Sequence, residues 1–236
     1  MVESKKVVKE GDFVKINYTG YIKDTNEVID TTLRSVGKDY NLSGEFEPVV
    51  VIAGKRYLIK GVDDALLGMK EGEKKKVVVE AKDGFGERKP ELVKTFSMRQ
   101  FAKSNRLPKV GDTVKVGNIY GRVVSINGGR IRVDFNHPLA GKTLIYELEV
   151  LEIIEKDEEK IKGLVAYHAM IPIEKLDVQI ENNKAKINLG DYSIGEGVAK
   201  LLEEEIKKNL KNIDAVEFKT SSPGESPIIK TKKKKS

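Results

Sequence analysis

The sequence predicts an α+β protein in which a sheet wraps a short helix. Three stretches, 14–18, 77–79 and 144–150, alternate apolar and polar residues, which is typical of half-buried antiparallel strands. Between the first two lies 62–69, whose apolar residues Val62, Ala65, Leu66 and Met69 share one helical face. A polar glycine turn at 70–73 leads into the second strand. Strands on both sides of one short helix favour the α+β class.

The pattern changes between residues 88 and 133. A helix is expected over 97–105, ending before Pro108, followed by strands at 113–116, 119–126 and 130–135. Asn127-Gly128-Gly129 predicts a tight hairpin between the last two strands. Because the flanking strands belong to the first unit, we interpret 89–135 as a small β-rich domain inserted into a loop, which divides the first domain into 1–88 and 136–155.

A third unit, α+β, is expected over 156–219. The charged stretch 155–160 is either a linker or the exposed start of a helix. Strands at 176–180 and 185–189 flank Glu181-Asn182-Asn183, where asparagines suit left-handed turn positions. An amphipathic helix at 198–210 and a strand at 215–218 follow. A unit of about 65 residues is marginally stable alone, so it could form a homodimer with its copy.

Composition excludes several classes of protein. No apolar run approaches the ~20 residues of a membrane helix, and we expect an intracellular, cytoplasmic protein. The absence of cysteine excludes thiol catalysis and disulfides, and two histidines exclude a multi-histidine metal site. The net charge of +6 arises mainly from five lysines at 230 and 232–235, which leave 38 basic residues against 37 acidic ones. The segment 220–236 is expected to be disordered, and contact of its lysines with RNA or ribosomes is possible but not favoured.

Several motifs occur in a fixed order along the first unit. They are Asn17-Tyr18-Thr19-Gly20, Ile29-Asp30-Thr31-Thr32, Ile52-Ala53-Gly54 running to Leu58-Ile59-Lys60-Gly61, Gly84-Phe85-Gly86, and the turn and strand of 136–151. Together they resemble the FKBP-type peptidyl-prolyl isomerases, specifically the SlyD-like and long archaeal members with an inserted domain. The resemblance covers roughly residues 8–154. It implies an antiparallel half-barrel sheet wrapped on a short helix, with the insertion in the flap loop over the active site.

The resemblance also implies a function and a site. The function is peptidyl-prolyl cis-trans isomerisation that accelerates proline-limited folding, with chaperone activity in the insert and unfolded polypeptides containing X-Pro bonds as partners. The residues that carry over are Tyr18, Asp30, Ile59, Phe85 and Tyr146 as catalytic residues, and Ile29, Val49, Leu58 and Val62 as substrate-binding residues. Tyr18 and Asp30 would pair at one wall, and the Ile59 amide would bond the substrate carbonyl. Phe85 would cover the pocket from the flap.

No cofactor or metal is expected for this chemistry. Rotation about an X-Pro bond meets a barrier of ~18 to 20 kcal/mol because amide resonance is lost. An apolar cleft and one hydrogen bond to the displaced carbonyl suffice to lower that barrier. The pocket departs from many relatives, since Val62 replaces a tryptophan, Ile29 a phenylalanine and Phe85 a tyrosine. A shallower, less aromatic pocket is therefore expected.

Other interpretations of the same residues stay open. Tyr18 and Tyr146 could be ordinary core aromatics, and Asp30 a turn or cap residue. His137 is expected to be structural and His168 packed. In the insert, roughly half or more of the large apolar residues should be buried, and the remainder would suit unfolded chains; they are Met98, Phe101, Leu107, Ile119, Tyr120 and Ile126. The rival function is a non-catalytic chaperone or an RNA-tethered binding module with a vestigial pocket.

Overall fold

The computed structural model describes residues 5–43, 46–101 and 107–220. The described residues pack as two compact units, one within 1–78 and 145–236 and the other within 79–144. The lysine-rich tail and part of the expected helix at 97–105 lie outside the described residues. Among the residues that are described, no helix is long and apolar enough to cross a bilayer.

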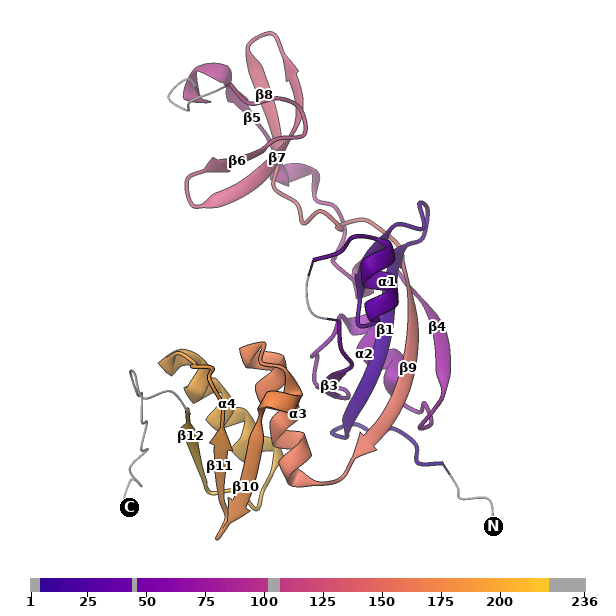
Figure 1. The fold of residues 1–236 in the computed structure, drawn as a ribbon. Coiled ribbons are helices and arrows are strands. Elements are labelled where there is room, and N and C mark those ends of the chain that lie inside the picture. Colours follow the sequence, from indigo (N-terminus) through magenta and orange to yellow (C-terminus); the bar gives the residue numbers. More distant parts are fainter. Residues whose placement is uncertain (1–4, 44–45, 102–106, 221–236) are drawn as a thin grey trace. The chain divides into compact units, whose positions relative to one another are not determined.

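The first unit is built on a five-stranded sheet (Figure 1). Its strands follow the order β2-β1-β9-β4, with β3 also paired to β1; they are β1 (Phe13–Ile22), β2 (Val28–Thr31), β3 (Val49–Ile52), β4 (Lys74–Val79) and β9 (Leu144–Ile154). The long strand β1 pairs antiparallel with β3 along its first half and with β2 along its second half. This sheet confirms the three strands predicted from alternation and the α+β class.

Two short helices accompany the sheet, α1 (Arg34–Asp39) and α2 (Lys60–Leu66). The predicted helix at 62–69 is present but begins earlier, at Lys60, and ends at Leu66. It ends there because Leu67 is already extended, with a ψ of 128°, and Gly68 follows with a φ of 82°. The expected apolar face is buried, with Val62, Leu66 and Met69 each at most 1% exposed. Helix α1 was not predicted, since its six residues show no apolar period.

The second unit contains a four-stranded antiparallel sheet in the order β5-β8-β7-β6. The strands are β5 (Val93–Ser97), β6 (Thr113–Val116), β7 (Ile119–Asn127) and β8 (Arg130–Asp134), and three 3₁₀ turns are η1 (Ala81–Asp83), η2 (Pro90–Leu92) and η3 (Met98–Phe101). Gly128 and Gly129 have φ of 54° and 71°, so the predicted hairpin is confirmed.

The prediction of a helix at 97–105 is wrong for residues 97–101, the part of it that the structure describes. Ser97 ends strand β5, and residues 98–101 form only a 3₁₀ turn. Phe96 pairs with Ile131 across the sheet, and Met98 and Phe101 pack on the same small core. The apolar residues therefore serve a strand and a turn, since this small domain needs them over its sheet.

The C-terminal segment forms a three-stranded sheet covered by two helices. The elements are α3 (Asp157–Ala169), η4 (Ile173–Lys175), β10 (Asp177–Glu181), β11 (Lys184–Asn188), α4 (Glu196–Asn209) and β12 (Ala215–Lys219), with sheet order β10-β11-β12. Asn182 and Asn183 occupy the left-handed turn positions as predicted, with φ of 49° and 60°. Strand β12 runs parallel to β11, and α4 makes the crossover between them.

This segment shares its hydrophobic core with the first sheet. Phe13 and Ile52 belong to the same buried cluster as Ile161, Leu202 and Val216. Helix α3 packs directly on β3. At the crossing, a Cβ added to Gly163 would lie 2.4 Å from Val50 Cγ1, so glycine permits this close approach.

Candidate functional site

The first feature of the site is a hydrogen bond between strands β1 and β2. Antiparallel pairing sets Gly20 opposite Asp30, which places Tyr18 diagonally across from the same carboxylate. The Tyr18 hydroxyl donates to Asp30 Oδ2 at 2.8 Å. Asp30 lies within a strand and binds a side chain on the neighbouring strand, so it is neither a turn nor a helix cap residue.

Tyr146 of β9 completes an aromatic corner with Tyr18. The two ring centroids lie 6.0 Å apart, and Tyr146 is only 6% exposed. Gly20 makes room for it, because a Cβ there would stand 2.8 Å from the Tyr146 ring. Burial, and then the charge of Asp30, raise the pKa of Tyr146 to about 12 and also raise the pKa of Tyr18. Both hydroxyls are therefore protonated near neutral pH and can donate hydrogen bonds.

Threonines and an asparagine fix the backbone around this pair. The Tyr18 amide donates to Thr32 Oγ1 at 2.9 Å, and the Thr32 hydroxyl donates to Asn17 Oδ1 at 2.9 Å. The buried hydroxyls of Thr19 and Thr31 lie 2.8 Å apart. Buried polar networks that are satisfied in this way hold a strand pair rigidly. The sequence motifs contain these residues but gave no sign of their role.

Ile59 stands at the start of helix α2. Its carbonyl accepts from the amides of Val62 and Asp63 at 3.0 Å each, which is the bonding of a helix N-cap. Its own amide finds no acceptor among the residues that the structure describes. A hydrogen-bond donor is therefore available at this position, as the sequence prediction requires.

Asp63 is a site residue that sequence reasoning missed. The side chain is fully buried. Its Oδ1 accepts from the Gly54 amide and its Oδ2 from the Arg56 amide, both at 2.9 Å. These bonds tie the loop that carries Leu58 and Ile59 to helix α2. The sequence signal for this role was an acidic residue in the first turn of a helix. Such a residue is equally typical of a carboxylate that only stabilises the helix dipole.

The remaining predicted residues lie in several elements. Ile29 is half-buried in β2, Val49 is half-buried at the start of β3, Leu58 is half-buried before Ile59, and Val62 is buried in α2. Phe85 belongs to the second unit, where its ring stacks on that of His137 with centroids 4.5 Å apart. The structure thus brings Tyr18, Asp30 and Tyr146 together by direct contact.

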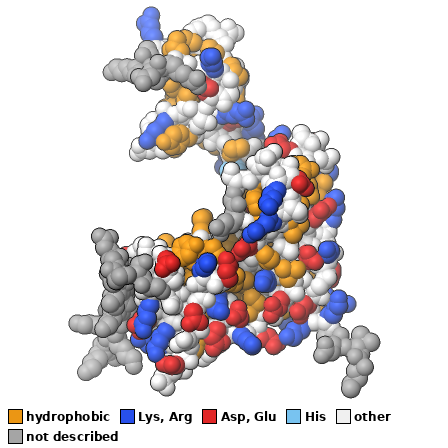
Figure 2. Space-filling model, in the orientation of Figure 1, with side chains coloured by type: hydrophobic (Ala, Val, Ile, Leu, Met, Phe, Trp, Pro, Cys, Tyr) orange, Lys and Arg blue, Asp and Glu red, His pale blue; other side chains and the backbone are white. Residues whose placement is uncertain are grey.

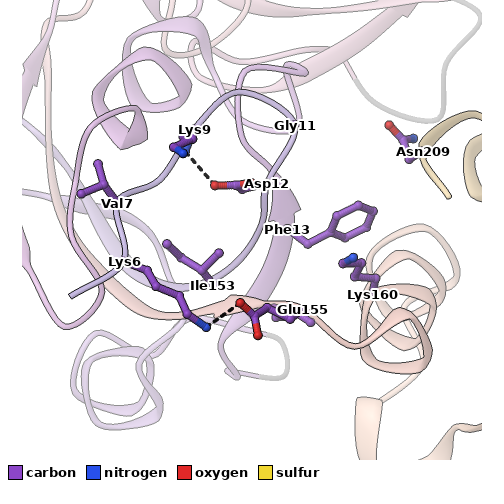
Figure 3. Close-up of a pocket in the computed structure, with 11 residues that line it drawn as sticks. Lys6, Val7, Lys9, Gly11, Asp12, Phe13, Ile153, Glu155, Lys160 and Asn209 are labelled. Atoms are coloured by element: carbon purple, nitrogen blue, oxygen red, sulfur yellow. Dashed lines mark hydrogen bonds and ion pairs between the residues drawn. The ribbon is translucent and has the colours of Figure 1, made fainter. Parts of the chain in front are cut away.

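A separate hollow of about 570 Å³ lies where the N-terminal segment meets the ends of β1 and β9 (Figure 3). Its walls include Phe13 and Lys160, and Lys6 forms an ion pair with Glu155 at 2.8 Å. None of the predicted pocket residues lines it. Paired charges of both signs suit this hollow poorly to a proline ring, which favours an apolar cleft.

Comparisons with known proteins bear on the family of this chain. A short-type peptidyl-prolyl cis-trans isomerase of Methanocaldococcus jannaschii is 31% identical over 156 residues, which cover 65% of this chain and 98% of that protein. The FKBP-type 16 kDa peptidyl-prolyl cis-trans isomerase of Escherichia coli K12 is 37% identical over 112 residues, covering 45% of this chain and 74% of that protein. The chain belongs to the FKBP-type peptidyl-prolyl cis-trans isomerases.

Two further matches refine this assignment within the FKBP-type isomerases. The isomerase SlyD of Treponema pallidum is 30% identical over 156 residues, covering 64% of this chain and 81% of that protein. The family model described as FKBP26, IF domain matches residues 94–139, which include all but the first residue of the β5-β8-β7-β6 sheet. The predicted resemblance to SlyD-like isomerases is confirmed.

Proposed function

We propose that this chain isomerises X-Pro bonds of polypeptides at the site formed by Tyr18, Asp30, Tyr146 and the Ile59 amide. The observation that carries the proposal is the Tyr18–Asp30 hydrogen bond beside the buried Tyr146, with an Ile59 amide that has no acceptor within the described part of the chain. Isomerisation demands little chemistry, and a ~10⁴-fold acceleration requires only about 5 to 6 kcal/mol of differential stabilisation. Nothing in this constellation requires a nucleophile.

In the proposed mechanism, the residues of this site stabilise the X-Pro amide in its twisted state. Half-buried Ile29, Val49 and Leu58 supply apolar contacts for the proline ring, and Val62 forms the floor. Exclusion of water favours the twisted state, in which the amide loses resonance and becomes less polar. The Ile59 amide donates to a substrate carbonyl and holds the chain while the bond rotates. Asp30 orients the neutral Tyr18 hydroxyl at the pocket wall.

Mutation of the pocket tests this proposal. Asp30→Ala and Phe85→Ala should each lower kcat/KM on a short proline peptide by about tenfold or more, or ~1.4 kcal/mol of transition-state stabilisation. Phe85 is included on the resemblance alone. Asp24→Ala is the matched control, since Asp24 is an exposed carboxylate in the adjoining turn. Folded Asp30 and Phe85 variants with wild-type turnover would overturn the assignment and favour the rival, a binding module with a vestigial pocket.

The proposal extends to chaperone activity in the 79–144 unit. Of the six apolar residues singled out there, Met98, Phe101 and Ile126 pack on the core of Val123, Ile131 and Val133. Leu107, Ile119 and Tyr120 are 52%, 55% and 65% exposed. Exposed apolar and aromatic side chains on a small stable domain suit transient capture of unfolded chains.

Three further expectations belong to the proposal. A cytoplasmic location would be tested by cell fractionation. A homodimer through the C-terminal segment was expected because a segment of this size has little core of its own. Within one chain, this segment already buries apolar side chains in the core that it shares with Phe13 and Ile52. Light scattering would test for the dimer. Contact of the lysine tail with RNA is not favoured, and such binding would fall steeply with salt.

A further inference from the structure

Basic residues are concentrated in the 79–144 unit. Apart from the five tail lysines, the chain has 38 basic and 37 acidic residues, yet the segment 89–135 alone has ten basic residues and three acidic ones. The rest of the chain is left with 28 basic residues against 34 acidic ones. Figure 2 shows several blue and few red side chains on this unit. The unit therefore has a positive field that the remainder of the chain lacks.

The sheet of this unit has one apolar face and one polar face. Val123, Ile131 and Val133 form the buried core on the apolar side. Side chains alternate between the two faces of a strand, and on β8 the exposed residues Arg130 and Arg132 alternate with the buried valine and isoleucine. The polar face is therefore open to solvent, and arginines stand along its middle.

Both arginines have only short polar neighbours across the strands. Within the described part of the chain, neither guanidinium group forms an ion pair or a side-chain hydrogen bond. Each is therefore available to an anion from outside. The partners in register are Ser97 and Asn127 for Arg130, and Thr95 and Ser125 for Arg132.

Tyr120 of β7 adds an aromatic ring to the same face. The residue is 65% exposed and lies opposite Lys115 of β6, whose ammonium group is 5.6 Å from the ring centroid. Arg122 follows two residues later, is also exposed, and lies opposite Asp134. That carboxylate is already held by Arg88 through hydrogen bonds of 2.6 and 3.1 Å. The face thus combines unpaired arginines with an exposed ring.

We propose that the polar face of the β5-β8-β7-β6 sheet binds single-stranded RNA. Arginine suits phosphate because its planar guanidinium donates two parallel hydrogen bonds. The ring of Tyr120 can stack on a base, which a single strand exposes and a duplex hides. The hydroxyl and amide groups beside Arg130 and Arg132 can bond the 2′-hydroxyl that distinguishes RNA from DNA. This activity goes beyond the proposed isomerisation and does not depend on it.

An acidic polypeptide is the competing occupant of this face. It would meet the same positive charges, but it has no planar bases to stack on Tyr120. Its carboxylates also have no counterpart to the 2′-hydroxyl, so the short polar residues beside the arginines would be left without a role. The combination of arginine, tyrosine and short polar side chains therefore favours RNA.

Fluorescence anisotropy of the full-length protein with a labelled single-stranded RNA of about 12 nucleotides tests the proposal. Affinity should fall steeply between about 50 and 200 mM salt. Changing Arg130 and Arg132 together to glutamine should lower the affinity by about tenfold or more at the lower salt concentration. It should also reduce the slope of log affinity against log salt by about 1.4, because two phosphate contacts are lost.

Variants of Tyr120 separate stacking from charge. Tyr120→Ala should lower the affinity by about fivefold or more at every salt concentration and keep the slope, because stacking releases no counterions. Tyr120→Phe keeps the ring and should keep the affinity.

Lys74 and Lys76, changed together to glutamine, are the matched control. They are exposed cations two residues apart on strand β4 of the other unit, and they form ion pairs of 3.3 and 3.1 Å with Glu149 and Glu147. This variant loses the same charge and should bind RNA like wild type. A variant with the five tail lysines changed to glutamine should retain most of the affinity.

Several results would overturn the proposal. RNA binding that survives the double arginine change in a protein shown by circular dichroism to be folded would do so, as would binding that disappears with the tail lysines alone. Equal affinity for single-stranded DNA of the same sequence would assign the face to polyanions in general. Displacement of the RNA by poly-glutamate at equal charge would assign it to acidic polypeptides.

Discussion

At the scale of single residues, Asp63 shows how a buried carboxylate can organise a pocket that it does not line. It binds two backbone amides of the loop leading to Ile59, and it is shielded from water. Loss of one acceptor leaves a partly buried amide without its partner, at a cost of up to about 1 to 3 kcal/mol. The position of the Ile59 amide depends on this anchor.

Replacement of Asp63 should therefore affect both stability and catalysis. Asp63→Asn keeps one carbonyl oxygen, so we expect about 1 to 3 kcal/mol of lost unfolding free energy and a reduced kcat/KM, measured by urea denaturation and peptide turnover. Asp64→Asn is the control, because Asp64 is 46% exposed and forms surface ion pairs with Arg56 and Lys60, which contribute little. Equal effects of the two variants would contradict this role.

His168 makes the stability of the protein depend on pH. Burial lowers its pKa from the ordinary 6.5, with Glu205 acting weakly in the opposite direction, and its Nε2 has no partner among the described residues. The unfolded chain binds a proton near pH 6.5 while the folded protein resists it. The contribution of neutral His168 to the free energy of unfolding is therefore complete above that pH and is lost as the pH falls below it.

The thermal midpoint measured from about pH 7 to pH 5 checks this dependence. Wild type should lose stability more steeply toward pH 5 than His168→Gln, whose side chain does not titrate. A slope that His168→Gln leaves unchanged would contradict the assignment.

Contacts between single residues could be predicted from the sequence where both residues lie in short recognisable motifs. Tyr18 and Asp30 were paired correctly, because each lies in a recognisable segment and an antiparallel register joins them. Asp63 was not identified. Its partners are backbone amides of the loop before helix α2, and no local pattern encodes such contacts.

At the scale of elements, the contact of helix α3 with strand β3 depends on one small residue. A Cβ on Gly163 would approach Val50 Cγ1 to 2.4 Å, whereas one on Gly197 of helix α4 meets nothing within 4 Å. Gly163→Ala should thus destabilise by about 1 to 3 kcal/mol through overpacking. Gly197→Ala should stabilise by up to about 1 kcal/mol through helix propensity. Urea denaturation measures both, and two changes of the same sign would contradict the packing argument.

Helix α3 also explains a limit of element prediction. Only its start was foreseen, as one alternative for the charged stretch 155–160. Its buried residues Ile161, Gly163, Leu164 and Val165 follow one another closely, because β3 packs on one side and the C-terminal sheet on another. Burial on two sides leaves no single apolar stripe to detect. Helix α4 has one such stripe, and its prediction at 198–210 was confirmed within two residues at its start.

At the scale of the whole molecule, the role of the 79–144 unit can be tested independently of the isomerase activity. Replacing residues 89–135 with a short glycine turn should leave turnover of tetrapeptides largely intact while it sharply slows proline-limited refolding of a whole protein. The reason is that captured chains lose their raised local concentration at the pocket. A variant with exposed Ile119 and Tyr120 changed to serine is a milder test of the same capture surface. Equal losses on peptide and protein would mean that the insert forms part of the pocket.

The shared core has a consequence for how this isomerase itself folds. Phe13 lies in the first strand and Val216 in the last, yet both belong to one buried cluster. During synthesis, Phe13 and Ile52 therefore lack part of their cover until nearly the whole chain has emerged. Contacts of such long sequence separation close slowly, and apolar surface left open meanwhile is prone to aggregation. A nascent molecule of this isomerase is thus itself a client for the kind of protection that the mature protein is proposed to give.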